Sequence, residues 1–144
     1  MPETRGLAGV APGAGGSGGS EAYSEVLLSH FRDPRNTGRL PCPDAVGRAE
    51  NPASGATLEL QVALREGCIR EARFQAEGCP ATIAAGSVMT ELLVGLTPDE
   101  AMALERIEVD QALGGLPPTR KHASGLAVDA VRATLADLER RSAG

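Results

Sequence analysis

The clearest pattern along the chain is an alternation of apolar and polar positions in its middle third. Every second residue of 58–64 is aliphatic, which predicts a β-strand with one apolar face. After a turn at 65–67, the range 72–76 repeats this alternation against charged residues, so the two runs predict an antiparallel hairpin with one wet face. The inward positions are Leu58, Leu60, Val62, Leu64, Ala72, Phe74 and Ala76.

Apolar residues at helical spacing predict helices on both sides of this hairpin. One is expected over 22–32, a second over 80–93, a short third after the capping box at 97–100, and a last one over 123–140. Residues 45–50 are compatible with a short edge strand. Together these elements indicate an α+β fold, in which helices pack on one face of a small antiparallel β-sheet of about three strands.

The chain length and the composition of its first residues predict the domain organisation. The full chain has 144 residues, which is the size of one domain. Residues 1–20 are rich in Gly, Ala, Ser and Pro, and such a segment buries too little apolar surface to offset the entropy of ordering it. We therefore expect a flexible tail over 1–20 and one folded domain over 21–141.

Composition and charge argue against several classes of function. The formal net charge of -5 and the aromatic content of 2% are unsuited to binding nucleic acid, which needs excess Lys and Arg or aromatic stacking surfaces. No apolar stretch reaches the ~20 residues that cross a bilayer, so we expect no membrane partner. Three cysteines, an odd count, favour a reducing cytoplasm over a disulfide-bonded secreted fold. No nucleophile–base pair, paired carboxylates or phosphate-binding glycine motif is recognisable, so we expect that the protein is not an enzyme.

Three separated segments carry a resemblance to a known family. They are Tyr23-Ser24-Glu25-Val26-Leu27 with His30-Phe31 and Pro34-Arg35-Asn36, then Asn51-Pro52-Ala53-Ser54-Gly55-Ala56 with Gly78-Cys79-Pro80, and last Leu116-Pro117-Pro118-Thr119-Arg120-Lys121-His122-Ala123-Ser124. In this order and spacing they resemble the iron–sulfur cluster scaffold family (IscU, or the N-terminal domain of NifU). The resemblance implies a small antiparallel sheet covered by helices. It also implies a transient [2Fe–2S] cluster, sulfur supplied by a cysteine desulfurase, and delivery to acceptor apoproteins.

The chain departs from the ligand set that the resemblance implies, which is three cysteines with a nearby Asp and His. Ser54 and Ala56 stand where the family has Cys and Asp, and Ala123 stands where it has another Cys. Cys79 and His122 remain as metal ligands, whereas Ser54 could ligate only as a costly alkoxide. Because clusters are normally held by four protein ligands, mostly thiolates, one chain holds an incomplete set for a cluster or iron. A homodimer could pool Cys79 and His122 from two chains.

The cysteines and the other histidine have distinct expected roles. Cys79 lies at the expected N-terminus of a helix, where unpaired N–H groups stabilise a thiolate. Two interpretations stay open for it, a thiolate that takes persulfide or metal and a buried structural thiol. Cys68 shares strand parity with Ala72 and is interpreted as a small core residue, and Cys42 lies in a loop without a counterpart among the family's ligands. His30 lies on the buried side of its helix and is interpreted as a packed core histidine.

One proline-rich segment resembles a partner-binding stretch. Leu116-Pro117-Pro118-Thr119-Arg120 is similar to the sequence that family members present to an Hsp70-type chaperone. An extended loop fixed by prolines loses little entropy on binding, which suits recognition. The alternative is a simple connector, irregular and exposed, before the last helix.

Two functional hypotheses follow from the resemblance and the missing ligands. The first is a divergent iron–sulfur cluster assembly scaffold with an incomplete site. The second is a module that binds no cluster but keeps the scaffold's protein-interaction surface and regulates assembly through its partners.

Overall fold

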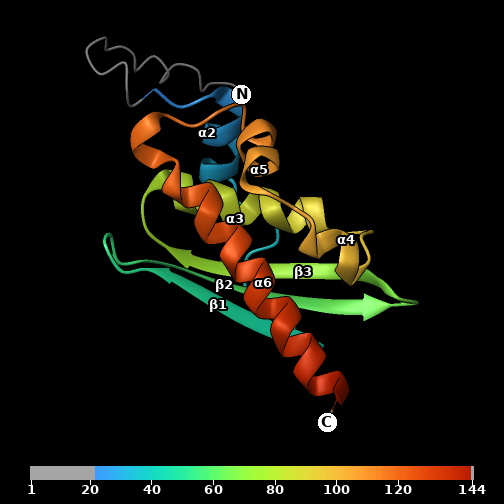
Figure 1. Ribbon diagram of the computed structural model, residues 1–144. Coiled ribbons are helices and arrows are strands. Elements are labelled where there is room, and N and C mark those ends of the chain that lie inside the picture. Colours follow the sequence, from blue (N-terminus) through green and yellow to red (C-terminus); the bar gives the residue numbers. More distant parts are fainter. Residues whose placement is uncertain (1–21, 144) are drawn as a thin grey trace.

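The computed structural model describes residues 22–143, and the tail expected over 1–20 lies outside the described residues. The helices lie on one side of a three-stranded antiparallel sheet, as the sequence predicted (Figure 1). Its elements in chain order are α2 (Glu25–Arg32), β1 (Ala45–Asn51), β2 (Ala56–Arg65), β3 (Cys68–Glu77), α3 (Pro80–Leu93), α4 (Pro98–Met102), α5 (Arg106–Ala112), the 3-10 helix η3 (Pro118–Arg120) and α6 (His122–Ala143).

The sheet has the strand order β1-β2-β3, with Leu60 at the centre of β2 facing Gly47 on β1 and Phe74 on β3. The inward positions of the predicted hairpin are buried, apart from Leu64 near the turn and Ala76 near the end of β3, which are half-buried. The expected edge strand is β1. The alternation in the sequence therefore predicted both the sheet and the face on which the core lies.

A bulge near the β2–β3 turn makes the interpretation of Cys68 as a core residue wrong. The register between the two strands shifts between Ala63 and Leu64. The extra residue changes the parity of the strand ends, so that Ile69 is buried and Cys68 is only half-buried. Cys42 is exposed, as expected for its loop.

Two glycines allow the long helices to approach the sheet closely. A Cβ atom at Gly47 on β1 would lie 2.2 Å from the Thr134 backbone nitrogen of α6. A Cβ atom at Gly86 on α3 would lie 2.4 Å from Cδ2 of Phe74. Both α3 and α6 therefore pack directly on the sheet and also contact each other (Figure 1).

An acidic side chain fixes the far half of α6 to the edge of the sheet. The Val46 N–H donates a hydrogen bond of 2.9 Å to Oδ2 of Asp137, which also pairs with Arg141 at 2.9 Å. The hydrogen bond from Val46 holds the pKa of Asp137 below its ordinary value, and the charges of Arg141 and Arg140 act in the same direction. This contact fixes the C-terminal half of α6 on β1.

The sequence predicted one of the two short helices, α4, but not the other, α5. Thr97 and Glu100 form the predicted capping box at the start of α4. In contrast, α5 was not predicted, because it spans one short run in which Val109 alone is buried. Within residues 22–143, no helix is long and apolar enough to cross a membrane.

We predict that Gly47→Ala lowers the free energy of unfolding by about 2–3 kcal/mol, because the new methyl group overlaps the backbone of α6. Gly125→Ala is the matched control. Its methyl group would meet only the flexible side chain of Arg106 at 3.1 Å, so its effect should stay within about 1 kcal/mol. Urea denaturation measures both variants, and equal stability of the two would contradict the packing described.

Candidate functional site

Cys79 is the N-cap of α3, directly after the end of β3, and its side chain is half-buried. Pro80 occupies the first helical position, as predicted. The Cys79 carbonyl accepts hydrogen bonds from the N–H groups of Thr82 at 2.9 Å and Ile83 at 3.3 Å. The thiol therefore lies at the short junction between β3 and α3.

The loop between β1 and β2 lies beside this junction. A Cβ atom at Gly78 would lie 3.0 Å from the Cβ of Ala56, so the two loops are in close contact. Ala56 is buried, and the Ser54 hydroxyl accepts a hydrogen bond of 3.2 Å from its N–H. Ser54 thus stabilises its own turn, and the position of the expected Asp is occupied by a buried methyl group.

The start of α6 supplies the remaining expected ligand, His122, which is half-buried as the first residue of that helix. Ala123 and Ser124 behind it are buried. Among residues 22–143, no group of three or more His, Cys, Asp or Glu side chains lies close enough together to hold a metal ion. Within one chain, Cys79 and His122 therefore do not belong to a complete set of metal ligands.

Thr82 is a site residue that the sequence analysis missed. Its side chain is fully buried in the first turn of α3, and its hydroxyl oxygen lies 3.6 Å from Sγ of Cys79. The available signal was the spacing, because an N-cap side chain points toward the residue three positions later. The structure brings Cys79, Thr82 and Ala56 together around Gly78.

The segment expected to bind a chaperone is only partly accessible. Leu116 and Pro117 are buried, and η3 replaces the extended conformation that we expected for the residues that follow. The Arg120 side chain donates a hydrogen bond of 3.1 Å from Nε to the hydroxyl of Tyr23. The expectation of a fully exposed loop is therefore wrong, because its first two residues pack into the protein and Arg120 is bonded to Tyr23.

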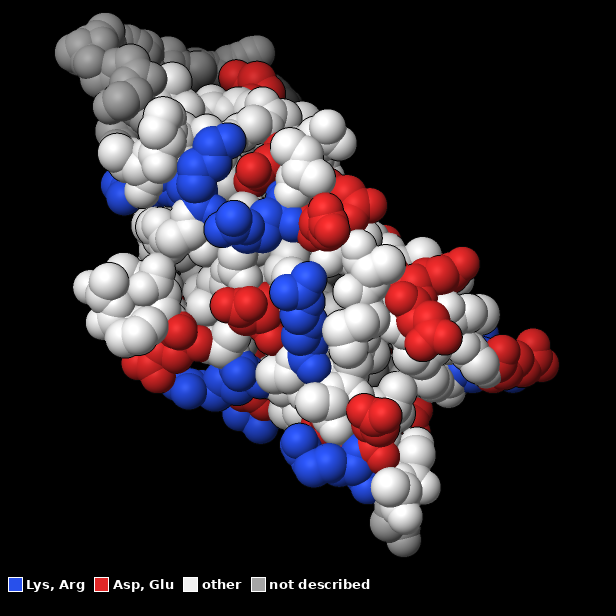
Figure 2. All heavy atoms as spheres, viewed as in Figure 1, with Lys and Arg blue, Asp and Glu red and all other residues white. Residues whose placement is uncertain are grey.

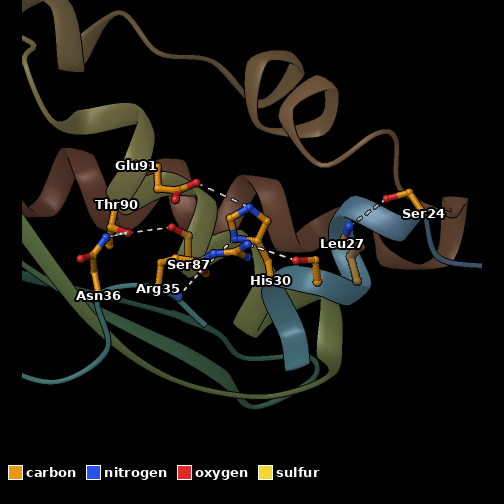
Figure 3. A network of polar contacts seen from close by, with 9 residues as sticks. Ser24, Leu27, His30, Arg35, Asn36, Ser87, Thr90 and Glu91 are labelled. Carbon is orange, nitrogen blue, oxygen red and sulfur yellow. Dashed lines mark hydrogen bonds and ion pairs between the residues drawn. The ribbon is translucent and has the colours of Figure 1, made fainter. Parts of the chain in front are cut away.

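His30 is a packed core histidine, as predicted, at the centre of a polar network between α2 and α3 (Figure 3). Its Nδ1 lies 2.7 Å from the hydroxyl of Ser87, which also accepts a hydrogen bond of 2.8 Å from the Arg35 N–H. Its Nε2 lies 3.6 Å from the carboxylate of Glu91. Burial lowers the pKa of His30 below 6.5, the positive charge of Arg35 lowers it further, and Glu91 opposes both.

A separate groove of about 850 Å³ lies between α5 and α6 and does not include Cys79. Both acidic and basic side chains line it, with Lys121 3.6 Å from Asp110. The face in Figure 2 likewise mixes the two signs of charge over these helices. Such a surface offers no uniform positive field for nucleic acid.

Comparison with known proteins gives a family match over the whole described part of the chain. The family model described as NifU-like N terminal domain matches residues 22–143. The chain is 38% identical over 120 residues to the "Iron-sulfur cluster assembly scaffold protein IscU 1" of Archaeoglobus fulgidus, covering 83% of this chain and 78% of that protein. It is 39% identical over 120 residues to the scaffold protein IscU of Escherichia coli, covering 81% and 93%.

A solved structure supports the fold independently of sequence. The N-terminal part of a NifU-like protein from Brucella abortus superposes with a TM-score of 0.60 at 19% identity, covering 83% of this chain and 94% of that one. At this identity the likeness concerns the fold alone.

We predict that the protein loses stability as the pH falls below 6.5, through protonation of His30 in the unfolded chain. Because the pKa of His30 is lower in the folded state, the unfolded state binds the proton first, and the stabilisation present above 6.5 is lost on acidification. The free energy of unfolding, measured from about pH 7.5 to pH 5, should show this loss in wild type and in His122→Gln. An equally steep loss in His30→Gln would refute the assignment.

Proposed function

Because this chain belongs to the NifU-like N-terminal domain family, we propose that it acts in iron–sulfur cluster assembly as a divergent scaffold with an incomplete ligand set. The match over residues 22–143 and the relatives named as cluster assembly scaffolds support the general role. The divergence is proposed from the resemblance, in which Ala56 and Ala123 stand at ligand positions, and the burial of both methyl groups supports it.

Each chain then contributes one thiolate, from Cys79, to its cargo. Iron–sulfur clusters need about four ligands, and imidazole can replace some of the thiolates. A homodimer that pools Cys79 and His122 would reach that number with two thiolates and two imidazoles. The cargo, a [2Fe–2S] cluster or iron, is thus held between two chains and only transiently.

The partners follow from the same role. A cysteine desulfurase supplies sulfur, acceptor apoproteins receive the cargo, and an Hsp70-type chaperone binds the segment Leu116, Pro117, Pro118, Thr119 and Arg120. Since Leu116 and Pro117 are buried, chaperone binding requires these two residues to become accessible first. The protein works in the cytoplasm and catalyses no reaction of its own.

The second candidate is a module that binds no cluster and regulates assembly through the partners of a scaffold. This candidate is compatible with the lack of any metal-binding group of three or more side chains among residues 22–143 of one chain. Retention of iron separates the two candidates.

We predict that anaerobic reconstitution with ferrous iron, sulfide and a thiol leaves about one iron per chain after desalting, with the visible absorption of a cluster. Cys79→Ser should lose this iron, because it removes the one thiolate that each chain contributes. Cys42→Ser is the matched control and should retain it, since Cys42 is exposed and remote from the proposed ligands in sequence.

Iron analysis and the absorption spectrum check this outcome. Equal iron in Cys79→Ser and wild type would exclude Cys79 as the ligand. A folded wild-type protein that retains no iron would exclude the scaffold role and leave the regulatory module.

A further inference from the structure

The groove between α5 and α6 begins beside one of the proposed ligands. On α6 it is lined by Gly125, Val128 and Arg132, which recur every three or four residues and so share one face of the helix. Its other end lies at Lys121, directly before His122. The groove has a volume of about 850 Å³ and follows α6 over roughly 15 Å. Whatever occupies it is therefore placed next to His122.

Several charged groups in the groove lack partners within the chain. The guanidinium groups of Arg106 and Arg132 and the carboxylate of Asp129 form no hydrogen bond or ion pair with another described residue. The Asp110 side chain is only 13% exposed, and its Oδ2 lies 3.6 Å from Nζ of Lys121. Its Oδ1 is buried and has no hydrogen-bond partner in the described part of the chain. A buried carboxylate oxygen costs free energy unless a donor reaches it, and the broad terminal torsion of aspartate lets Oδ1 turn toward one.

Apolar surface lies between these charges. Ile107 lines the groove with 54% of its surface exposed, and Val128 lines it from α6. A Cβ atom at Gly125 would lie 3.1 Å from Cδ and 3.6 Å from Nη1 of Arg106, so the Arg106 side chain extends over this glycine to α6. Arginine beside exposed apolar side chains is common in protein–protein interfaces.

The balance of charge indicates the kind of occupant. Three acidic and three basic side chains line the groove. Neither a polyanion nor a polycation is complementary to such a set, whereas a polypeptide segment carries both signs of charge together with apolar side chains.

We propose that this groove docks a segment of the acceptor apoprotein, with a basic side chain directed to Asp110 and an acidic one to Arg132. The proposal rests on the proposed function, in which His122 is a cluster ligand and an acceptor receives the cargo. Because the groove adjoins His122 and does not include Cys79, its occupant lies beside the imidazole and not beside the thiol. This position suits an acceptor, whereas a desulfurase has to reach Cys79.

Docking at this place brings the acceptor's thiols to the ligands that they replace. Each incoming thiol loses its proton and forms an Fe–S bond, while a bond from iron to His122 or Cys79 breaks. The released Cys79 thiolates take up two of the four protons, and the imidazoles or solvent take up the others. The [2Fe–2S] core moves whole, and no electron is exchanged.

The test is the affinity of the metal-free protein for a purified apo-ferredoxin of the [2Fe–2S] type, measured by isothermal titration calorimetry at low salt. Wild type should bind this acceptor. Arg132→Glu reverses an exposed charge, so the dissociation constant should rise about tenfold. Asp110→Asn keeps the shape but removes the charge, and the constant should rise about threefold to tenfold.

Two controls separate the groove from general effects of charge. Arg70→Glu makes the same change in net charge at an exposed position of β3 outside the groove, and it should bind like wild type. A purified cysteine desulfurase should bind wild type and Arg132→Glu equally. If Asp110→Asn lowers the thermal midpoint, Arg132→Glu carries the comparison, since its position is exposed.

No binding by wild type, or equal binding of the ferredoxin by wild type and Arg132→Glu, overturns the proposal. Weaker binding of the desulfurase by Arg132→Glu also overturns it, because the groove would then dock the sulfur donor. Failure of the proposed function is distinguishable, since these affinities are measured without metal. A folded wild type that retains no iron would end the scaffold role, whereas unchanged affinities with normal iron retention would end only the role of the groove.

Discussion

The structure depends on how closely two long helices approach one face of a small sheet. Glycine makes this approach possible at Gly47, where α6 crosses β1, and at Gly86, where α3 crosses Phe74. Because protein interiors are densely packed, neither helix can shift without opening a void or a clash. The ends of the strands and the starts of α3 and α6 are therefore held in fixed relative positions, and these are the places from which the candidate site is built.

Under the proposed function, side chains that pack in the core stand at two of the family's ligand positions. Ala56 and Ala123 are buried methyl groups that contribute to the core, whereas the corresponding family positions are expected to carry Asp and Cys. Cys79 is then the thiol of the proposed site, and the hydroxyl oxygen of Thr82 lies 3.6 Å from its sulfur. Such a ligand set suits a cluster shared between two chains better than a cluster enclosed by one subunit.

Local patterns in the sequence predicted the sheet, most of the helices and the burial of His30, because each depends on periodicity over a few residues. They failed where distant segments meet. The bulge that half-exposes Cys68 is a property of pairing between strands. The contact of Tyr23 with Arg120 joins the start of the described chain to the segment just before α6. Thr82 was missed for a related reason, since its importance follows from the loops that enclose it.

The central claim is that each chain supplies one thiolate, so that a cluster must be shared. Native mass spectrometry of the anaerobically reconstituted protein tests this most directly, because it reports the number of chains and the bound mass in one species. The account predicts a dimer that carries one [2Fe–2S] cluster. A monomer that carries a complete cluster would contradict it.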